Sequence, residues 1–203
     1  MSFCYHGVCL KGDDISLLEG PHWLNDQIIA FYLQYLHNVI YPNKTKLLFV
    51  SPEIVQCIKI VPSSEADVFL GPLKPEKRNF IFFPLNDNSR DAAGGTHWSL
   101  LVFSRPENTF YNFDSLGNFN APTARKMFRI LREVLKCPTA FFEDHPSASQ
   151  QNGFDCGIHV LCNVSEVTRH VLRTGQVEGT PIASSYEIKH KRDELLLILK
   201  SLQ

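Results

Sequence analysis

Three runs of aromatic and β-branched residues in the middle of the chain constrain its fold more than any other feature. They cover residues 80–83, 98–103 and 109–113, and a short polar segment, 104–108, separates the second run from the third. Runs of this composition are typical of strands, and a short polar connection between two of them predicts a hairpin. We therefore expect the middle of the chain to contribute consecutive strands to one sheet.

Helical patterns lie on both sides of these strands. Apolar residues recur at helical spacing over residues 24–40, with Asn25 or Asp26 available as the N-cap, and Ser51 followed by Pro52 is typical of a second helix start. Farther along, the pattern predicts helices at 121–135 and directly after Cys156, a strand at 139–142, and a last helix that begins with a capping box of Ser184 and Glu187. Helices gathered around consecutive strands indicate an α+β domain.

The bulk composition is that of an ordinary globular protein without a strong charge. The 203 residues carry a formal net charge of -1, and 44% of them are hydrophobic. A nucleic-acid or membrane partner would normally require a basic surface, so we expect neither. The one basic cluster, residues 189–192, is expected to be a solvated helix face. No repeat or linker divides the chain, which predicts a single domain over residues 1–203, and we expect a monomer.

The six cysteines form no CxxC pair and no regular framework, so we expect all of them to be reduced. They are Cys4, Cys9, Cys57, Cys137, Cys156 and Cys162. The grouping of Cys4, His6 and Cys9 matches no usual zinc spacing, and we expect no metal and no cofactor. We also find no signal-peptide pattern and no apolar run approaching the ~20 residues of a membrane span. Together these features predict a cytoplasmic or nuclear protein.

Residues 150–157, Gln-Gln-Asn-Gly-Phe-Asp-Cys-Gly, place a cysteine on a tight turn directly before an apolar helical pattern. Cys156 would then lie at a helix N-terminus, where unpaired backbone N–H groups and the helix dipole favour the thiolate. This arrangement is typical of a nucleophile. The alternative is a structural cysteine, since free cysteines are among the most buried residues.

A cysteine nucleophile needs a histidine partner and a group that orients the histidine. His97 opens the second predicted strand, and Asp114 closes the third. If the hairpin is centred between Arg105 and Pro106, His97 is directly opposite Asp114, and the two side chains point to the same face. The alternatives are a strand-end histidine and a turn-forming aspartate.

Other side chains near the cysteine have competing interpretations. His159 lies one helical turn after Cys156, and His145 precedes the motif; packing is the expected role of both. Gln150 is the candidate for a second oxyanion donor beside the Cys156 backbone N–H, because acyl transfer needs donors aimed at the developing negative charge. A solvated glutamine is the alternative, and Gln151 offers the same chemistry.

Four separated segments resemble one protein family. Residues 23–26, 95–100, 113–115 and 150–157 resemble the ubiquitin-like-protein-specific cysteine proteases, the sentrin or SUMO protease family, in which histidine, aspartate, glutamine and cysteine follow in the same order. The resemblance implies a papain-like-superfamily cysteine protease domain of α+β class, with a central, mostly antiparallel sheet flanked by helices. Within the family, the chain is most similar to the deneddylase branch.

The resemblance also implies roles for individual residues. It makes His97, Asp114 and Cys156 a catalytic triad and Gln150 the oxyanion donor. The implied substrate-binding residues are Trp23, Asp26, Asn86, Asp87, Gly94, Gly95 and Trp98. The two tryptophans would flank a channel that a Gly-Gly tail can enter because glycine has no Cβ, and core packing is the alternative for both indoles. The loop 86–95 would close over the tail.

The activity implied is cysteine-protease cleavage after the C-terminal Gly-Gly of the neddylation modifier, both in conjugates such as cullins and in the modifier's precursor. The partner would be that ubiquitin-like modifier and its conjugates. A SUMO-specific protease with the same chemistry is one alternative. A modifier-binding module without turnover is another.

Overall fold

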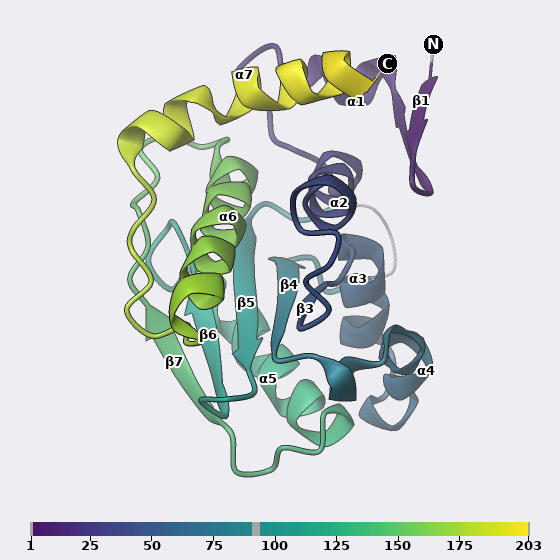
Figure 1. Ribbon diagram of the computed structural model, residues 1–203, viewed down its shortest axis with the longest axis vertical. Helices are drawn as coiled ribbons and strands as arrows, with labels where there is room; N and C mark the ends of the chain where they lie inside the picture. The colour runs from purple at the N-terminus through teal and green to yellow at the C-terminus, as the bar shows by residue number, and fades with distance from the viewer. Residues whose placement is uncertain (1, 91–93, 203) are drawn as a thin grey trace.

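Five strands form the main sheet of the computed structural model, which describes residues 2–90 and 94–202 (Figure 1). In order across the sheet they are β3 (Leu47–Phe49), β4 (Phe80–Asn86), β5 (Trp98–Ser104), β6 (Thr109–Phe113) and β7 (Phe141–His145). The central strands β4, β5 and β6 pair antiparallel, and the edge strands β3 and β7 pair parallel with their neighbours. The predicted α+β class with consecutive central strands is confirmed.

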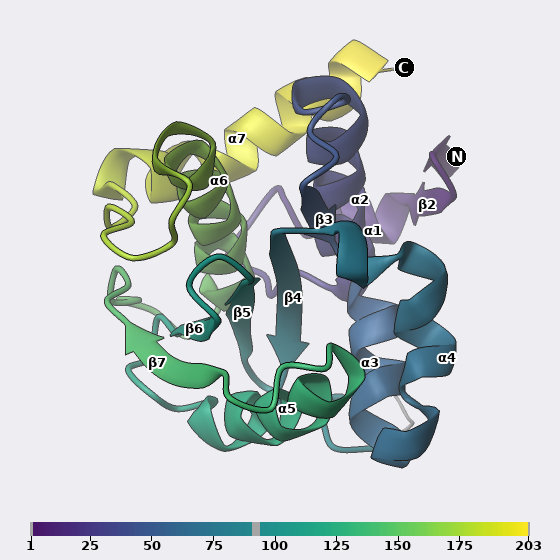
Figure 2. The same ribbon diagram turned by 60° about the horizontal axis from the view of Figure 1, so that its bottom comes forward.

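Helices cover both faces of this sheet (Figure 1, Figure 2). One face carries α2 (Asp26–Tyr35), which continues as the π-helix η1 (Leu36–Ile40), and α6 (Cys156–Thr174); the other carries α3 (Pro52–Ile60), α4 (Asp67–Leu70) and α5 (Ala121–Val134). The helix α7 (Ser185–Leu202) crosses one end of the molecule near α1 (Gly12–Ser16). Three 3-10 turns lie between α3 and β4: η2 (Ser63–Glu65), η3 (Gly71–Leu73) and η4 (Pro75–Lys77). In the described part of the chain, no helix is both long and apolar enough to cross a membrane.

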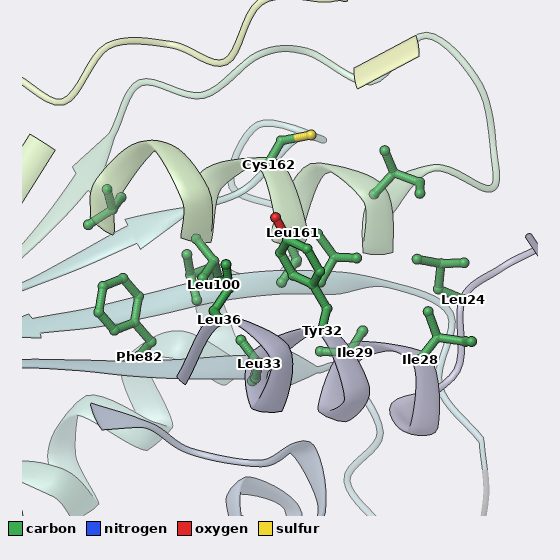
Figure 3. Close-up of a cluster of buried hydrophobic side chains, with 14 of the residues drawn as sticks. Leu24, Ile28, Ile29, Tyr32, Leu33, Leu36, Phe82, Leu100, Leu161 and Cys162 are labelled. Carbon is green, nitrogen blue, oxygen red and sulfur yellow. The ribbon is translucent and has the colours of Figure 1, made fainter. Parts of the chain in front are cut away.

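Alternating strand side chains supply a hydrophobic cluster on each face of the sheet. Phe82, Leu100 and Val102 pack with α2 and α6, and Figure 3 shows side chains of the strands meeting those of the two helices in this cluster. Ile81 and Phe83 point to the other side and pack with α3 and α5. Burial on both faces explains why these strands read as continuous apolar runs. It also gives the strand ends a rigid support.

Two predicted helix starts are confirmed by their caps. Asn25, rather than Asp26, caps α2, because its Oδ1 accepts a hydrogen bond from the Ile28 backbone N–H at 3.1 Å. The capping box of α7 also forms: the Ser184 N–H donates to the Glu187 carboxylate at 3.0 Å, and the Glu187 N–H donates to the Ser184 hydroxyl at 3.2 Å. Local sequence signals therefore place these helix boundaries correctly.

The hairpin between β5 and β6 differs from the predicted register by two residues. Ser104 pairs with Thr109, so the loop is the four-residue turn 105–108, and His97 is not directly opposite Asp114. The last loop residue is an asparagine in the left-handed conformation, with φ of 49°, a conformation that asparagine tolerates better than most residues. A shift of two residues keeps every side chain on its predicted face, because side chains alternate with a period of two. The two side chains therefore still share a face.

A second hairpin, not predicted from the sequence, pairs β1 (Ser2–Tyr5) with β2 (Val8–Lys11). Its register places Cys4 opposite Cys9, with Cα atoms 4.0 Å apart, and the two form a disulfide. The expectation that all six cysteines are reduced is therefore wrong for this pair. The spacing did not reveal the bond because it depends on a strand pairing around the turn at Gly7. The free cysteines are Cys57, Cys137, Cys156 and Cys162.

Candidate active site

Cys156 is the first residue of α6, as predicted, and only 2% of it is exposed. The turn before it is held by Asn152, whose side-chain oxygen accepts hydrogen bonds from the backbone N–H groups of Phe154 at 3.0 Å and Asp155 at 2.9 Å. Backbone N–H groups in the first turn of a helix have no acceptor within that helix. The thiol therefore lies at a position where negative charge is favoured.

Gly157 lets α6 pack closely against the segment that precedes α2. A Cβ atom at this position would lie 2.8 Å from the Leu24 Cβ, which is closer than two such atoms can approach without a shift. The glycine therefore allows the segment with Trp23 and Leu24 to lie directly beside the start of α6. This is how residues more than a hundred positions apart come to border one site.

His97 and Asp114 meet where β5 begins and β6 ends. The His97 Nε2 lies 2.6 Å from the Asp114 Oδ1, and both side chains are 1% exposed. The Asp114 carboxylate also accepts hydrogen bonds from the backbone N–H groups of Leu116 at 3.0 Å and Asn120 at 2.7 Å. Burial alone would raise the pKa of Asp114, but the bonds from His97 and these two N–H groups hold it below its usual range. Asp114 is therefore an ionised acceptor that fixes the imidazole.

The other imidazole nitrogen of His97 is the one available to Cys156. Nδ1 is buried and makes no hydrogen bond of normal length and angle to any residue that the structure describes. Burial lowers the pKa of His97, but hydrogen bonding to Asp114 and Cys156, together with their charges, outweighs this effect and raises the pKa to about 9. Long or poorly aligned contacts between catalytic groups are common before substrate binds. His97 therefore holds a proton at neutral pH beside the thiol.

Gln150 is held next to the same strand end. Its backbone N–H donates to the Ser115 carbonyl at 2.8 Å, and its side-chain Oε1 accepts from the Ser115 hydroxyl at 3.0 Å. Its Nε2 donates to the Asn152 carbonyl at 2.5 Å. Gln150 is 9% exposed, which excludes the solvated alternative, whereas Gln151 is exposed.

The two rival histidines have packed surroundings of their own. His159 is 5% exposed, and burial keeps its pKa below the usual value in spite of the nearby Asp155. His145 lies against Phe113 with ring centroids 4.5 Å apart, and burial lowers its pKa as well. Both are therefore neutral packing residues, and His97 is the histidine that the structure joins to a carboxylate.

A groove of about 600 Å³ leads to Cys156 and His97. It contains all but one of the predicted substrate-binding residues, namely Trp23, Asp26, Asn86, Gly94, Gly95 and Trp98. Its walls come from the segment before α2, from α3 and from the loop between β4 and β5. Residues 91–93 of the predicted closing loop lie outside the described part of the chain.

Hydrogen bonds from their indole nitrogens fix both tryptophans in this groove. Trp23 is 49% exposed and donates from Nε1 to the Gly153 carbonyl at 2.5 Å. Trp98 is half-buried and donates from Nε1 to the Leu24 carbonyl at 3.0 Å. An indole as exposed as that of Trp23 is not a core side chain, so the core-packing alternative does not apply to it. Trp98 borders both the groove and the core cluster.

Asp87 lies at the base of the loop rather than among the residues that line the groove. Its carboxylate accepts from the Thr96 N–H at 2.6 Å, the Thr96 hydroxyl at 2.7 Å and the His97 N–H at 3.0 Å. Burial would raise the pKa of Asp87, but these bonds hold it below its usual range. Gly95, with φ of 94°, adds to the tight packing, since a Cβ there would lie 1.8 Å from the Asn86 Oδ1. Asp87 therefore ties the end of the loop to the strand that carries His97.

Arg192 of α7 joins the two segments that flank Cys156. Its guanidinium donates to the carbonyls of Leu17 at 2.6 Å and His22 at 2.7 Å, and to the Asp155 carboxylate at 2.8 Å. The neighbouring Lys191 is 4% exposed. The prediction that this basic cluster is a solvated helix face is wrong for these two residues, because that side of α7 faces the protein.

Other supporting residues were also missed by sequence reasoning. Lys59 is buried and donates to the Asn86 carbonyl at 2.5 Å, and burial lowers its pKa to about 8. The Asn120 side chain donates to the Ser99 hydroxyl at 2.9 Å and the Leu85 carbonyl at 3.2 Å. Each of these bonds joins segments that are distant in sequence. The only local sequence signal for these supporting residues was the run of turn-forming residues after Asp114, which includes Asn120.

Comparison with known proteins places this site in a family. The description "Ulp1 protease family, C-terminal catalytic domain" matches residues 22–194, a range that contains all the candidate site residues. Sentrin-specific protease 8 of Rattus norvegicus is 35% identical over 194 residues, which cover 94% of this chain and 89% of the relative. NEDD8-specific protease 1 of Arabidopsis thaliana is 31% identical over 209 residues, covering 98% of this chain and 92% of the relative.

The fold is that of solved proteases of the same kind. The C-terminal Ulp1 protease domain in complex with Smt3, the yeast ortholog of SUMO, has a TM-score of 0.75 at 21% sequence identity. The likeness covers 100% of this chain and 89% of that chain, and it confirms the predicted protease fold. Because the family description matches residues 22–194 and two relatives are more than 30% identical along most of the chain, the chain belongs to the Ulp1 protease family.

Proposed function

We propose that this chain is a cysteine protease that hydrolyses the peptide or isopeptide bond after the C-terminal glycine of NEDD8. The observation that carries the chemistry is the His97–Asp114 contact of 2.6 Å, placed beside Cys156 at the start of α6. Support for NEDD8 as the modifier comes from the relatives named NEDD8-specific protease 1 and sentrin-specific protease 8. The precursor of NEDD8 and its conjugates are the proposed substrates.

In the acylation half of the reaction, the Cys156 sulfur attacks the carbonyl carbon of the terminal glycine. The thiol proton is held on His97, and Asp114 keeps the imidazolium oriented through Nε2. When the tetrahedral intermediate collapses, the C–N bond breaks and the proton passes from His97 to the leaving amine. A thioester between Cys156 and the glycine remains.

In the deacylation half, His97 takes a proton from a water molecule that attacks the thioester carbonyl. The C–S bond then breaks, which restores the thiolate of Cys156 and releases the modifier with a free carboxylate. Because the same histidine first donates and then accepts a proton, its pKa has to lie near the working pH range. The pKa of about 9 for His97 beside a carboxylate and a thiol is compatible with the donating step.

Charge on the carbonyl oxygen would be stabilised by two donors. The Gln150 Nε2 carries two N–H groups, of which one is bonded to the Asn152 carbonyl. The other N–H and the Cys156 backbone N–H would hold the oxyanion. Loss of one such donor typically costs about 10² to 10³ in rate.

The groove would select the tail that reaches this centre. Trp23 and Trp98 line this groove together with His97 and Cys156. Glycine has no Cβ, so a Gly-Gly tail can lie against two indoles where larger residues would collide. We therefore expect activity to depend strongly on the two terminal glycines of the modifier.

Precursor processing tests this proposal. Purified protein would be mixed separately with precursors of NEDD8, SUMO and ubiquitin, and kcat/KM would be measured for each by gel or mass spectrometry. We expect NEDD8 precursor to be cleaved much faster than the other two. Equal or faster cleavage of SUMO precursor would contradict the substrate assignment, and tight binding of NEDD8 without cleavage would instead indicate a binding module.

The matched variant is Cys156→Ala. We expect it to lose all turnover while it still binds NEDD8, because the change removes the thiol and keeps the other residues that line the groove. Calorimetric titration with mature NEDD8 checks the binding. Turnover that persists in this variant would overturn the assignment of Cys156 as the nucleophile.

A further inference from the structure

We propose that Ser115 is a positioning residue that orients the Gln150 carboxamide toward the oxyanion. The inference rests on the proposed function, because it concerns the oxyanion donor of that reaction. Ser115 directly follows Asp114 at the end of β6 and is 4% exposed. Its hydroxyl oxygen lies 3.0 Å from the Gln150 Oε1, in a contact between two buried side chains.

The chemistry of the partners determines which way the carboxamide points. Its oxygen and nitrogen ends have nearly the same shape, so a glutamine can be turned by 180° unless its partners distinguish them. The Asn152 carbonyl can only accept, so it requires the Nε2 end at 2.5 Å. The Ser115 hydroxyl donates to the Oε1 end. Two bonds at opposite ends therefore fix both the orientation and the plane of the amide.

This arrangement leaves one N–H of Nε2 for the substrate. An amide nitrogen has two hydrogens, and the Asn152 carbonyl takes one of them. If the carboxamide turned over, Oε1 would face the Asn152 carbonyl, and the negative charge of the reaction would meet an oxygen instead of a donor. The Asn152 carbonyl, which can only accept, therefore selects this orientation, and the Ser115 hydroxyl, which donates to Oε1, holds the carboxamide in the position from which it can stabilise the oxyanion.

The end of β6 would then support both the proton-transfer group and the oxyanion donor. Asp114 holds His97 at 2.6 Å, and the next residue, Ser115, holds Gln150 at 3.0 Å. The backbone is part of the same support, since the Gln150 N–H donates to the Ser115 carbonyl at 2.8 Å. Two adjacent residues on a rigid strand end thus set the proton-transfer group and the oxyanion donor relative to each other.

Steady-state cleavage of a NEDD8 precursor by Ser115→Ala tests the proposal. We expect kcat to fall by about two- to tenfold with KM unchanged, the range that corresponds to one net hydrogen bond. Ser115→Cys keeps the size of the side chain but is a weaker donor, so it should give an intermediate kcat. Ser104→Ala is the matched control, because it removes a fully buried serine hydroxyl at the far end of β5 and should leave kcat unchanged.

A double-mutant cycle with Gln150→Ala separates positioning from a purely structural role. If Ser115 acts through the carboxamide, Ser115→Ala should have no further effect on kcat once Gln150 has been replaced. An equal loss in both backgrounds, or a change confined to KM, would overturn the proposal. Absence of cleavage by the unmodified protein would refute the proposed function instead, so the two failures are distinguishable.

Discussion

The His97–Asp114 pair and the groove that leads to it are built in different ways. Both side chains of the pair lie at the ends of central strands and are 1% exposed, and the carboxylate is held by three donors. Trp23, by contrast, lies in a segment outside any helix or strand, is 49% exposed and is tied to the turn before Cys156 by a bond to the Gly153 carbonyl. The sheet therefore supports the His97–Asp114 pair, whereas irregular segments support the exposed wall of the groove at Trp23. Substitutions in the two regions should change different kinetic constants.

The largest effect is expected for Asp114→Asn. Both carboxylate oxygens accept from N–H donors, so an amide nitrogen in either position would face another donor. His97 would lose its orienting acceptor, and we expect kcat/KM to fall by about 10²- to 10⁴-fold with little change in KM. Cleavage of NEDD8 precursor measures this, with thermal unfolding to check that the variant is folded. A kcat/KM within threefold of the wild-type value would show that the pair is not the catalytic support.

The pH dependence of the same assay tests whether His97 is the group that gives its proton to the leaving amine. The pKa of His97 is raised to about 9, so the imidazolium persists below that pH and is lost above it. We therefore expect kcat/KM to hold on the alkaline side until about pH 9 and then to fall, because the leaving amine no longer receives its proton. Asp114→Asn removes the bond and the charge that contribute most to raising the pKa of His97, so the alkaline limb should move to lower pH. A limb at the same pH in both proteins would exclude His97 as the titrating group.

A smaller effect, on KM rather than on kcat, is expected for Trp23→Ala. The change removes an exposed wall of the groove, and we expect KM to rise by about tenfold while kcat changes much less. Trp23→Phe keeps an aromatic ring but loses the N–H that bonds to the Gly153 carbonyl, so its KM should lie between those of the wild type and Trp23→Ala. Comparing the two variants separates the contribution of the aromatic ring from that of the hydrogen bond to Gly153. If kcat fell more than KM rose, Trp23 would belong with the chemistry rather than with recognition.

The smallest effect is expected for Gly157→Ala, and mainly on stability. The added Cβ would lie 2.8 Å from the Leu24 Cβ, and overpacking of this kind typically costs about 1–3 kcal/mol. Urea unfolding should show a lower free energy of unfolding. Gly153→Ala is the control, because its Cβ would meet nothing within 4 Å. Equal stability of Gly157→Ala and wild type would mean that α6 does not need this close contact.

Local patterns were enough to predict most of the fold. The strand runs, the capping box of α7 and the cap of α2 each depend on residues close in sequence, and each is confirmed. The hairpin register was wrong by two residues because loop length and the left-handed asparagine at its end were not evident from composition. A shift of two residues leaves each side chain on its predicted face of the sheet, so His97 and Asp114 still meet.

What the sequence could not show is mostly bonding between distant segments. Ser115 and Gln150 are 35 residues apart, and Arg192 reaches Asp155 from another helix. Such contacts leave no periodic or motif signal, because each residue alone looks like an ordinary turn or surface residue. The Cys4–Cys9 bond is different, since it depends on a short hairpin whose two strands and turn all lie within ten residues of the sequence.

Covalent capture by a modifier probe tests in one measurement whether Cys156 is the nucleophile and NEDD8 the preferred modifier. NEDD8 carrying a C-terminal propargyl amide would be incubated with the protein, and the modified peptide identified by mass spectrometry, with SUMO and ubiquitin probes in parallel. We expect a stoichiometric adduct on Cys156 with the NEDD8 probe, much slower labelling by the other two, and none in Cys156→Ala. An adduct on Cys57, the other free thiol in the groove, would contradict Cys156 as the nucleophile, and faster labelling by the SUMO probe would contradict NEDD8 as the preferred modifier.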